Sequence, residues 1–587
     1  MIVRRNVIAP VFSVVLGVFT AVASVSASPL AYRTVALTGT DGVYGPGLGA
    51  GVTFNLLDGP PAMNLTGQVV FRGADISTGG LPNGLWMRPD ATNTSFNLNL
   101  AIENGPQPGG GVYSTGNSYN SMAINNAGDT AFRIGASKGA FSSDAGTMQR
   151  VALAGDFAPG TGNATYATSA VASGSPLFNQ AGQTAYVGSL TVGTGSPPVS
   201  ISSNVNNSQC IYVGKGDNAN NPNANNTCVL RGTDWFASLG GTSADTKINS
   251  PTQSTMSLNG NGSYVVSTTL QGTAIVTGTG ATSNSVAIVS NRTGSNDVVA
   301  RVGNAAPDST GAPSADVYRT LGSSAIGFNN LGHVSFVSSL RQGATQTNAS
   351  ALFTDINGGT LKRFASAGGT IGNVYALGDT SNTTPLSEFT SLTYGTSATF
   401  STALLNSNDE MLFSANLSSG GQAYFRTDLF GNLHRAVRIG DIAFSPDPLS
   451  TGGTGTSTIS GVNNITMNAL GQVAFLSNIS GPGVSVGLGN GSVLWATELD
   501  GTMDPVVRSG TQFTDGLGNT HTIASINLAL NSGNEDGRAS SFNDAGFLAF
   551  NLQFTDGTAG DFVTQIPEPA AIGFVLISGL FFIRRRG

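Results

Sequence analysis

Short runs of alternating apolar and polar residues recur along most of the chain, and turns rich in Gly, Asn, Ser and Thr separate them. In the stretch "GQVAF", residues 471–475, the large apolar Val473 and Phe475 flank the small Ala474. Successive side chains of a strand point to opposite faces, so this alternation indicates a strand with one face on a core. The pattern therefore predicts an all-β protein made of many short strands.

A motif of Asn, two residues, Gly, three residues and an aromatic occurs eight times, at intervals of 54 to 80 residues. An Asn at the first position of a tight turn accepts a backbone hydrogen bond, and a Gly at the fourth adopts the left-handed backbone that closes the turn. We therefore expect hairpin turns here; Asn side chains that contact a ligand are the alternative. Two copies deviate, because Asp409 replaces the Gly and Val266 replaces the aromatic. The motif residues are Asn64 and Gly67, Asn125 and Gly128, Asn179 and Gly182, Asn259 and Gly262, Asn329 and Gly332, Asn406 and Asp409, Asn468 and Gly471, and Asn543 and Gly546.

Two further strands recur with the same count. One is a short apolar strand followed by a turn, as in "VLWATELDG" from Val493, and the other ends in Gly, as in "VVRSG" up to Gly510. Each unit thus predicts four short strands. A single unit cannot bury its apolar faces, so neighbouring units must pack together, and four-stranded units in a radial array form a β-propeller.

The two ends of the repeat array complement each other. The last unit, which ends in "DFVTQ" from Asp561, lacks its Gly-terminated strand, and a matching strand from Thr34 to Gly39 stands at the start of the array. A ring that pairs these segments leaves no bare sheet edge, whereas an open array leaves two. We therefore expect residues 28–565 to form one closed propeller of about eight four-stranded blades. Seven blades, two smaller propellers and an open β-repeat array are the alternatives.

The N-terminus has the features of an export signal. Arg4 and Arg5 precede an apolar run, and Val25-Ser26-Ala27 offers small residues for cleavage. We expect residues 1–27 to be a signal peptide that is cleaved after Ala27, and an uncleaved anchor is the alternative.

The C-terminal residues 566–587 combine a Pro-Glu-Pro triplet, an apolar run from Ala570 to Ile583 and an arginine cluster. Together these features resemble the PEP-CTERM sorting signal of Gram-negative-type bacteria. The resemblance implies processing by an exosortase, transient membrane association through the tail, and delivery to the cell surface or extracellular matrix. The motif residues are Pro567, Glu568, Pro569, Arg584, Arg585 and Arg586.

The repeats also resemble a bacterial tandem-repeat family described by its NxxGxxAF motif. This resemblance covers most of residues 33–565, and it implies no catalytic residues for this chain.

Charge and cysteine usage narrow the possible functions. Loss of both ends removes five Arg and one Glu and takes the formal charge from −7 to −11. Such an acidic chain is unsuited to nucleic acid, whose binding depends on Lys and Arg contacts. Cys210 and Cys228 open two adjacent strands of one unit, and in an exported chain they predict a disulfide; two free thiols are the alternative.

Candidates for catalytic chemistry are few. His333, His434 and His521 lie in different units, and no nucleophile elbow is visible. Asp156 and Asp441 follow the Gly-terminated strands of their units, where they predict turns. A ring of carboxylates that holds Ca²⁺ near a central channel is the alternative, and we otherwise expect no cofactor.

These observations favour a non-enzymatic, surface-sorted module that binds extracellular polysaccharide or protein through loops on a rigid scaffold. A structural envelope component and a glycan hydrolase or lyase that uses loop carboxylates are the alternatives.

Overall fold

The computed structural model describes residues 30–566, with gaps. The predicted signal peptide with Ala27 and the sorting motif from Pro567 onward lie outside the described residues. Within the part of the chain that is described, no helix is long and apolar enough to cross a membrane. The positions left out inside this range are 58, 76–82, 90–94, 114–118, 135–138, 172–175, 203–204, 217–224, 278–282, 322–324, 343–344, 380, 390–391, 397–399, 450–452 and 530–535.

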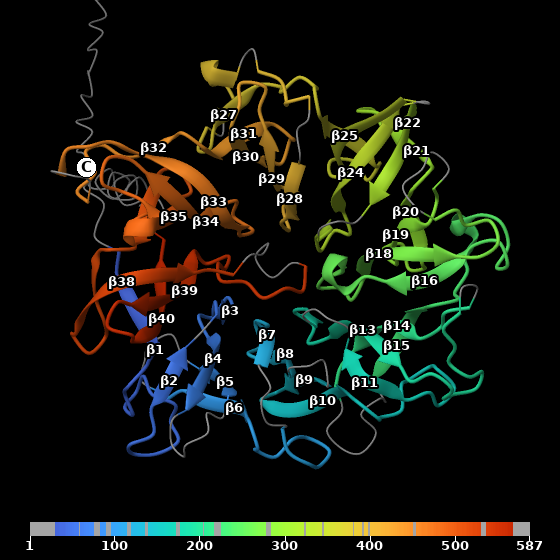
Figure 1. Cartoon of the computed structure of the whole chain (residues 1–587), viewed down its shortest axis with the longest axis horizontal. Helices are drawn as coiled ribbons and strands as arrows, with labels where there is room; N and C mark the ends of the chain where they lie inside the picture. Colours follow the sequence, from blue (N-terminus) through green and yellow to red (C-terminus); the bar gives the residue numbers. More distant parts are fainter. Residues whose placement is uncertain are drawn as a thin grey trace, which may run out of the picture.

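The strands form eight mainly antiparallel sheets, arranged as the blades of one ring (Figure 1). This arrangement confirms the prediction of an all-β propeller with eight blades. It excludes seven blades, two smaller propellers and an open array.

The first four blades follow the chain order. Blade 1 contains β2 (Phe54–Leu57), β3 (Ala62–Met63), β4 (Val69–Asp75), β5 (Asn83–Arg88) and β6 (Leu98–Ile102). Blade 2 contains β7 (Tyr119–Ile124), β8 (Thr130–Ile134), β9 (Gly139–Asp144) and β10 (Thr147–Leu153). Blade 3 contains β11 (Tyr166–Val171), β12 (Leu177–Phe178), β13 (Thr184–Leu190), β14 (Gln209–Gly214) and β15 (Asn226–Arg231). Blade 4 contains β16 (Lys247–Pro251), β17 (Ser257–Leu258), β18 (Tyr264–Gln271), β19 (Val286–Ser290) and β20 (Asp297–Arg301).

The other four blades continue this order, and short 3-10 helices lie in the connections. Blade 5 contains β21 (Ala305–Pro307), β22 (Pro313–Leu321), β23 (Gly327–Phe328), β24 (Val334–Gln342), β25 (Thr345–Thr354) and β26 (Lys362–Ser366). Blade 6 contains β27 (Val374–Ala376), β28 (Phe400–Leu405), β29 (Met411–Asn416), β30 (Gln422–Thr427) and β31 (Leu433–Arg438). Blade 7 contains β32 (Ile442–Phe444), β33 (Ser457–Met467), β34 (Val473–Ser480), β35 (Ser492–Thr497) and β36 (Met503–Arg508). Blade 8 contains β37 (Gln512–Thr514), β38 (Thr520–Asn527), β39 (Phe547–Phe554), β40 (Ala559–Gln565) and β1 (Tyr32–Leu37). The 3-10 helices are η1 (Ala237–Leu239), η2 (Gln253–Thr255), η3 (Ser387–Phe389) and η5 (Val486–Leu488).

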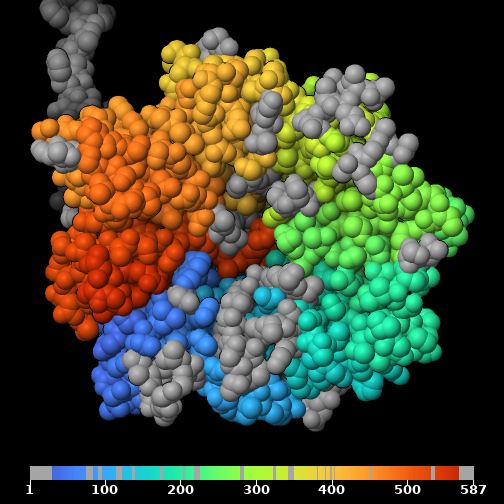
Figure 2. Space-filling view, viewed as in Figure 1, coloured from blue at the N-terminus to red at the C-terminus, as the bar shows by residue number. Residues whose placement is uncertain are grey.

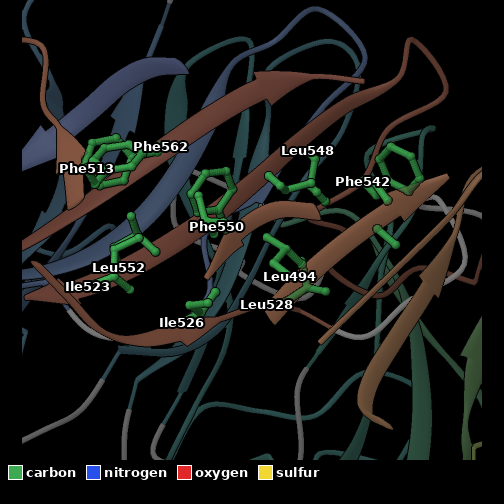
Figure 3. Close-up of a cluster of buried hydrophobic side chains, with 14 of the residues drawn as sticks. Leu494, Phe513, Ile523, Ile526, Leu528, Phe542, Leu548, Phe550, Leu552 and Phe562 are labelled. Atoms are coloured by element: carbon green, nitrogen blue, oxygen red, sulfur yellow. The ribbon is translucent and has the colours of Figure 1, made fainter. Parts of the chain in front are cut away.

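Both faces of the central strands are buried, which corrects the expectation that only one face meets a core. Val473, Ala474 and Phe475 in β34 all have no exposed surface. The reason is that each blade packs between two neighbours, so the alternation separates large from small side chains instead of buried from exposed ones. Phe550 of blade 8 packs with Leu494 of blade 7 in one such core (Figure 3).

The N-terminal strand completes the last blade, as predicted. β1 pairs antiparallel with β40, with Tyr32 opposite Thr564 and Leu37 opposite Gly560. Blade 1 and blade 8 consequently lie side by side (Figure 2). The ring is closed by hydrogen bonds between the two ends of the described chain.

Candidate functional site

The eight Asn motifs form the turns that the sequence predicts. In the first copy, the Asn64 side-chain oxygen accepts a hydrogen bond from the backbone N–H of Gln68 at 3.0 Å, and Gly67 has a left-handed φ of +82°. The motif that lacks the Gly keeps the same backbone, because Asp409 has a φ of +62°. Each motif thus makes the tight turn that leads into a central strand of its blade, which is β4, β8, β13, β18, β24, β29, β34 or β39.

The same asparagines also join the blades, a role that the sequence did not reveal. The Asn side-chain amide of one blade donates to the main-chain carbonyl of the motif Asn in the next blade. Such bonds run from Asn64 to Asn125 (2.9 Å), Asn179 to Asn259 (2.9 Å), Asn259 to Asn329 (3.2 Å), Asn329 to Asn406 (3.0 Å), Asn406 to Asn468 (3.1 Å), Asn468 to Asn543 (3.0 Å) and Asn543 to Asn64 (2.8 Å). Between blades 2 and 3, the backbone N–H of Asn126 donates to the Gln180 side chain at 2.7 Å. These hydrogen bonds connect the turn of each blade to the turn of the next, all the way around the ring. A closed circuit of such short contacts can only surround the ring axis, so these asparagines hold the blades together at the centre.

The residue after each turn Gly often packs against the turn of the following blade. Gln68 accepts from the Asn64 amide at 2.7 Å, and a methyl group added at Gly128 would come within 2.7 Å of its side-chain oxygen. Gln183 and Gly262 repeat this relationship at 2.6 Å. The Gly therefore serves two purposes: it adopts the left-handed backbone and it leaves room for the neighbouring side chain.

A segment of the chain itself occupies the middle of the ring. Residues 536–541, between β38 and β39, reach across the centre (Figure 1). Their carbonyl groups accept hydrogen bonds from three blades: Ser540 from Met63 (2.8 Å), Gly537 from Phe178 (2.6 Å) and Asp536 from Leu258 (2.9 Å). At this level the axis is filled by protein.

The two carboxylates singled out in the sequence make turns and do not converge. Asp441 accepts from the backbone N–H of Arg438 at 2.8 Å, and Asp156 lies 3.2 Å from Arg150 Nε. Burial raises the pKa of Asp156 against the opposing effect of Arg150. Among the described residues, no group of three or more His, Cys, Asp or Glu could hold a metal ion. The alternative of a Ca²⁺-binding carboxylate ring has no support in this part of the chain.

His333 explains why the motif of blade 6 has Asp409 in place of the Gly. His333 follows the turn of blade 5, and its Nδ1 lies 2.7 Å from Asp409 Oδ1 in the turn of blade 6. The hydrogen bond to the Asp409 carboxylate raises the pKa of His333. His333 thus takes the packing place that Gln68 fills in blade 1, and the Asp that replaces Gly supplies its partner.

Two carboxylates of blade 6 have opposite pKa shifts. Burial raises the pKa of Glu410, whose Oε2 accepts from the Asn406 amide at 2.7 Å. Burial alone would also raise the pKa of Asp428, but hydrogen bonds from Asn432 and Asn382 lower it. Opposite pKa shifts in neighbouring carboxyl groups are a feature that acid–base catalysis uses, although structural ion pairs produce it too.

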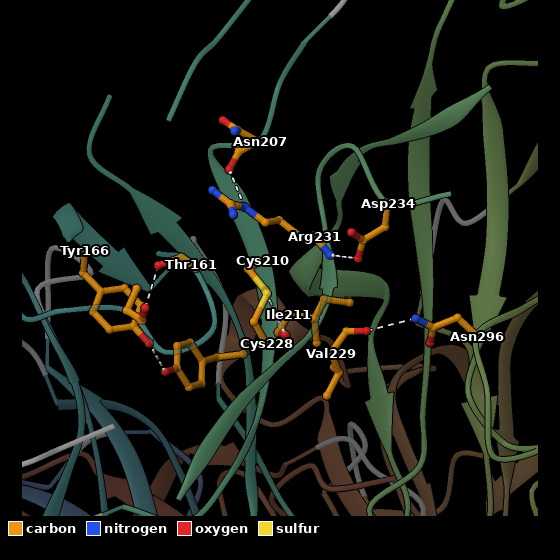
Figure 4. The surroundings of a disulfide bond; sticks show 12 residues. Thr161, Tyr166, Asn207, Cys210, Ile211, Cys228, Val229, Arg231, Asp234 and Asn296 are labelled. Carbon is orange, nitrogen blue, oxygen red and sulfur yellow. Dashed lines mark hydrogen bonds between the residues drawn. A yellow bond between two sulfur atoms is a disulfide. The ribbon is translucent and has the colours of Figure 1, made fainter. Parts of the chain in front are cut away.

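Cys210 and Cys228 form a disulfide between β14 and β15 of blade 3, with their Cα atoms 5.9 Å apart (Figure 4). This confirms the predicted bond. It excludes two free thiols.

A groove of about 510 Å³ lies on blade 7. Its walls come from the end of β32, the residues that follow it, β36 and the turn after β36. They are largely apolar, and they include Phe444, Pro448, Leu449, Pro505, Val506 and Val507.

Arg508 is the charged residue that lines this groove, and only 5 % of it is exposed. Its guanidinium lies 4.8 Å from the centre of the Phe444 ring, Nε donates to Asn490 O at 3.1 Å, and Nη1 donates to Asp447 Oδ1 at 2.7 Å. Nη2 is buried and has no hydrogen-bond partner among the described residues. A buried donor without an acceptor costs free energy, and Nη2 of Arg231 in blade 3 is in the same state.

Arginines end the outer strands of other blades too, and this recurrence is the sequence signal that could have indicated Arg508. Arg301 and Arg231 also end the outer strands of their blades, and each donates Nε to a loop carbonyl, of Asn284 and Asn207 respectively. Arg508 differs because the segment that contains Asp447 folds over it. No local pattern reveals that contact.

Comparison with known proteins gives a family. A protein-family model described as "Family of unknown function (DUF7453)" matches residues 63–573. No curated protein matches. Solved structures that resemble the chain are the α-L-arabinofuranosidase Arb93A of Fusarium graminearum, the polysaccharide lyase Uly1 and YCF48 of Cyanidioschyzon merolae.

These structures are distant from the chain. Arb93A is 10% identical, covers 62% of this chain and 88% of its own, and has a TM-score of 0.25. Uly1 is 9% identical over 92% of this chain and 98% of its own, with a TM-score of 0.27. YCF48 is 12% identical over 88% and 99%, with a TM-score of 0.25. Scores this low carry no argument about activity.

Proposed function

The chain belongs to DUF7453, a family of unknown function, and from this premise we propose that it is an exported binding protein of the cell surface or extracellular matrix. Its binding site is the groove on blade 7, and its ligand is an apolar peptide segment that presents a carbonyl or carboxylate oxygen to Arg508. The protein acts as a scaffold, without turnover.

The buried, unpartnered Nη2 of Arg508 is the observation that carries this proposal. A guanidinium donates to carbonyl and carboxylate oxygens, and the surrounding Pro, Val and Leu side chains offer apolar contact area. A polysaccharide would need several polar partners, and Phe444, the aromatic ring of the groove, is already stacked on Arg508. Protein is therefore favoured over polysaccharide as the ligand.

Export and sorting follow from the two chain ends. The signal peptide directs the chain out of the cytoplasm, and the PEP-CTERM-like tail makes it a substrate of an exosortase-type enzyme after transient tethering to the membrane. A disulfide between Cys210 and Cys228 is consistent with folding in an oxidising compartment.

Selection of peptides from a random phage library on the immobilised full chain tests the binding function. We expect selected peptides to lose about tenfold in affinity on Arg508→Met, since this change removes a hydrogen bond to the ligand. Leu449→Asp, in the half-buried wall of the groove, should weaken the same peptides without removing Arg508. Arg301→Met is the matched control. Peptides that bind all three variants as well as the parent would refute the groove as the site.

A glycan hydrolase or lyase is the second candidate, and the opposite pKa shifts of Glu410 and Asp428 favour it. Incubation with matrix polysaccharides should then release new reducing ends or unsaturated sugars, and Glu410→Gln should abolish the release. Gln preserves the acceptor for the Asn406 amide, so the variant keeps the blade junction. Loss of cell cohesion on deletion of the protein, without peptide binding or product release, would instead favour a structural envelope component.

A further inference from the structure

We infer that the face of the propeller that carries the Asn turns lies on a lipid bilayer, with the exposed side chains of blades 5 to 7 in the interface. The inference rests on the proposed membrane tether, and it adds which face of the body meets the lipid.

The chain leaves the described body on this face. Ile566, which follows β40, donates its backbone N–H to Gly546 O in the Asn turn of blade 8 at 2.8 Å. Twenty-one residues follow it in the sequence, and they contain the apolar run from Ala570 to Ile583. When that run enters a membrane, the short Pro-Glu-Pro connection keeps the Asn-turn face close to the lipid surface.

Large apolar side chains gather on the same face. In blade 6, β28 to β31 are successive antiparallel strands, so the turn between β30 and β31 lies at the same end as the Asn turn between β28 and β29. The turn between β30 and β31 exposes 82 % of Phe430 and 53 % of Leu429. The Asn turns of the flanking blades expose 62 % of Leu331 and 42 % of Leu470.

The tips that carry Phe430 and Leu470 are neighbours. Arg426, at the end of β30, donates to the Gly471 carbonyl, which joins the Phe430 turn to the turn that holds Leu470. In the corresponding place of the Asn turn, blades 2, 3 and 8 have alanine. Four of the exposed apolar tips on this face thus lie in three consecutive blades, and Leu65 in the Asn turn of blade 1 (42 % exposed) is a further one.

The turn that carries Phe430 is held firmly by its own hydrogen bonds. Asp428 Oδ1 accepts from the backbone N–H of Phe430 at 2.8 Å and of Asn432 at 2.9 Å, and Oδ2 accepts from the Asn382 amide at 2.9 Å. The carboxylate is thus engaged within the protein, while the Leu429 and Phe430 side chains project outward. Exposed aromatic and aliphatic tips of this kind insert at the boundary between headgroups and acyl chains.

A quenching experiment tests this orientation. Full chains with Phe430→Cys or Leu488→Cys are labelled with an environment-sensitive dye and incorporated into vesicles of phosphatidylethanolamine and phosphatidylglycerol that contain doxyl lipid. Leu488 is the matched control, because it is 66 % exposed in η5, in the loop between β34 and β35, at the end of blade 7 opposite to its Asn turn. We expect the dye at position 430 to be quenched about threefold more than the dye at 488, because only the first lies at the depth of the lipid.

The outcomes separate the orientation from the tether. Vesicle flotation of the chain with equal quenching at both positions overturns the orientation and leaves the tether intact. Failure of the chain to float overturns the tether and the orientation together. Dimers in light scattering, with no quenching at 430, would assign the apolar tips to a second copy of the chain and overturn the inference.

Discussion

The side-chain amide of Asn543 donates a hydrogen bond to the main-chain carbonyl of Asn64, 479 residues earlier in the chain, at 2.8 Å. Both residues are buried at the centre of the ring, and the bond joins the last blade to the first. Together with β1 in blade 8, it gives the ring a second closure, near the axis.

We expect Asn543→Asp to lower the free energy of unfolding by about 1–3 kcal/mol, because a carboxylate cannot donate to the buried carbonyl of Asn64. The Asp oxygen can still accept from the backbone N–H of Phe547, so the turn itself is preserved. Urea denaturation followed by tryptophan fluorescence measures the change. Asn357→Asp, the same substitution in an exposed turn, is the control, and an equal loss in both variants would contradict a special role of the ring.

Gly471→Ala should cost more than Gly557→Ala, although both glycines have a left-handed backbone. A methyl group at Gly471 would collide with Arg426 and come within 2.6 Å of Glu410, whereas Gly557 faces open space. The control variant carries only the strain of the left-handed backbone, of roughly 1–2 kcal/mol. Denaturation midpoints of the two variants separate crowding at the blade junction from backbone strain; matching midpoints would show that the junction relaxes freely.

The contact between His333 and Asp409 should make stability depend on pH. The pKa of His333 is raised in the folded chain, so its contribution to stability is full below the unfolded value of about 6.5 and is lost as the pH rises through the folded value. We expect His333→Gln to lower the denaturation midpoint at about pH 5.5 by more than at about pH 8.5. The comparison with the parent chain at each pH removes the contribution of His521, whose pKa is also raised. A difference that is the same at both values would show that the pair is not charged.

Removal of the disulfide should destabilise blade 3. The bond joins residues separated by 18 positions, and closure of a loop of this length contributes about 3 kcal/mol in the chain-entropy account. The double variant Cys210→Ser and Cys228→Ser should therefore denature at lower urea concentration than the parent. Reduction of the parent should reproduce the effect, and reduction of the variant should change nothing.

The sequence predicted the features that rest on local patterns. The turn geometry of Asn64 and Gly67 is contained in four residues, and the missing strand of the last unit could be matched to the first strand by its own pattern. The disulfide followed from two cysteines on adjacent strands. These predictions needed only the repeat and its register.

Contacts between remote segments had no such pattern. The second hydrogen bond of Asn543 depends on where blade 1 lies, and residues 536–541 have no apolar periodicity that marks them as buried. Arg508 and Asp447 are 61 residues apart, and only the folded chain brings them together over the groove. The candidate site was missed because its chemistry is created by packing between segments.

The pairing of β1 with β40 sets the order in which the molecule can be completed. The strand that emerges first from synthesis or export has no partner until the very last blade arrives, so the propeller cannot be sealed from one end to the other as it is made. A chain that stops before β40 has an unpaired N-terminal strand and an exposed sheet edge. Proteases cleave such segments more readily than they cleave the closed ring.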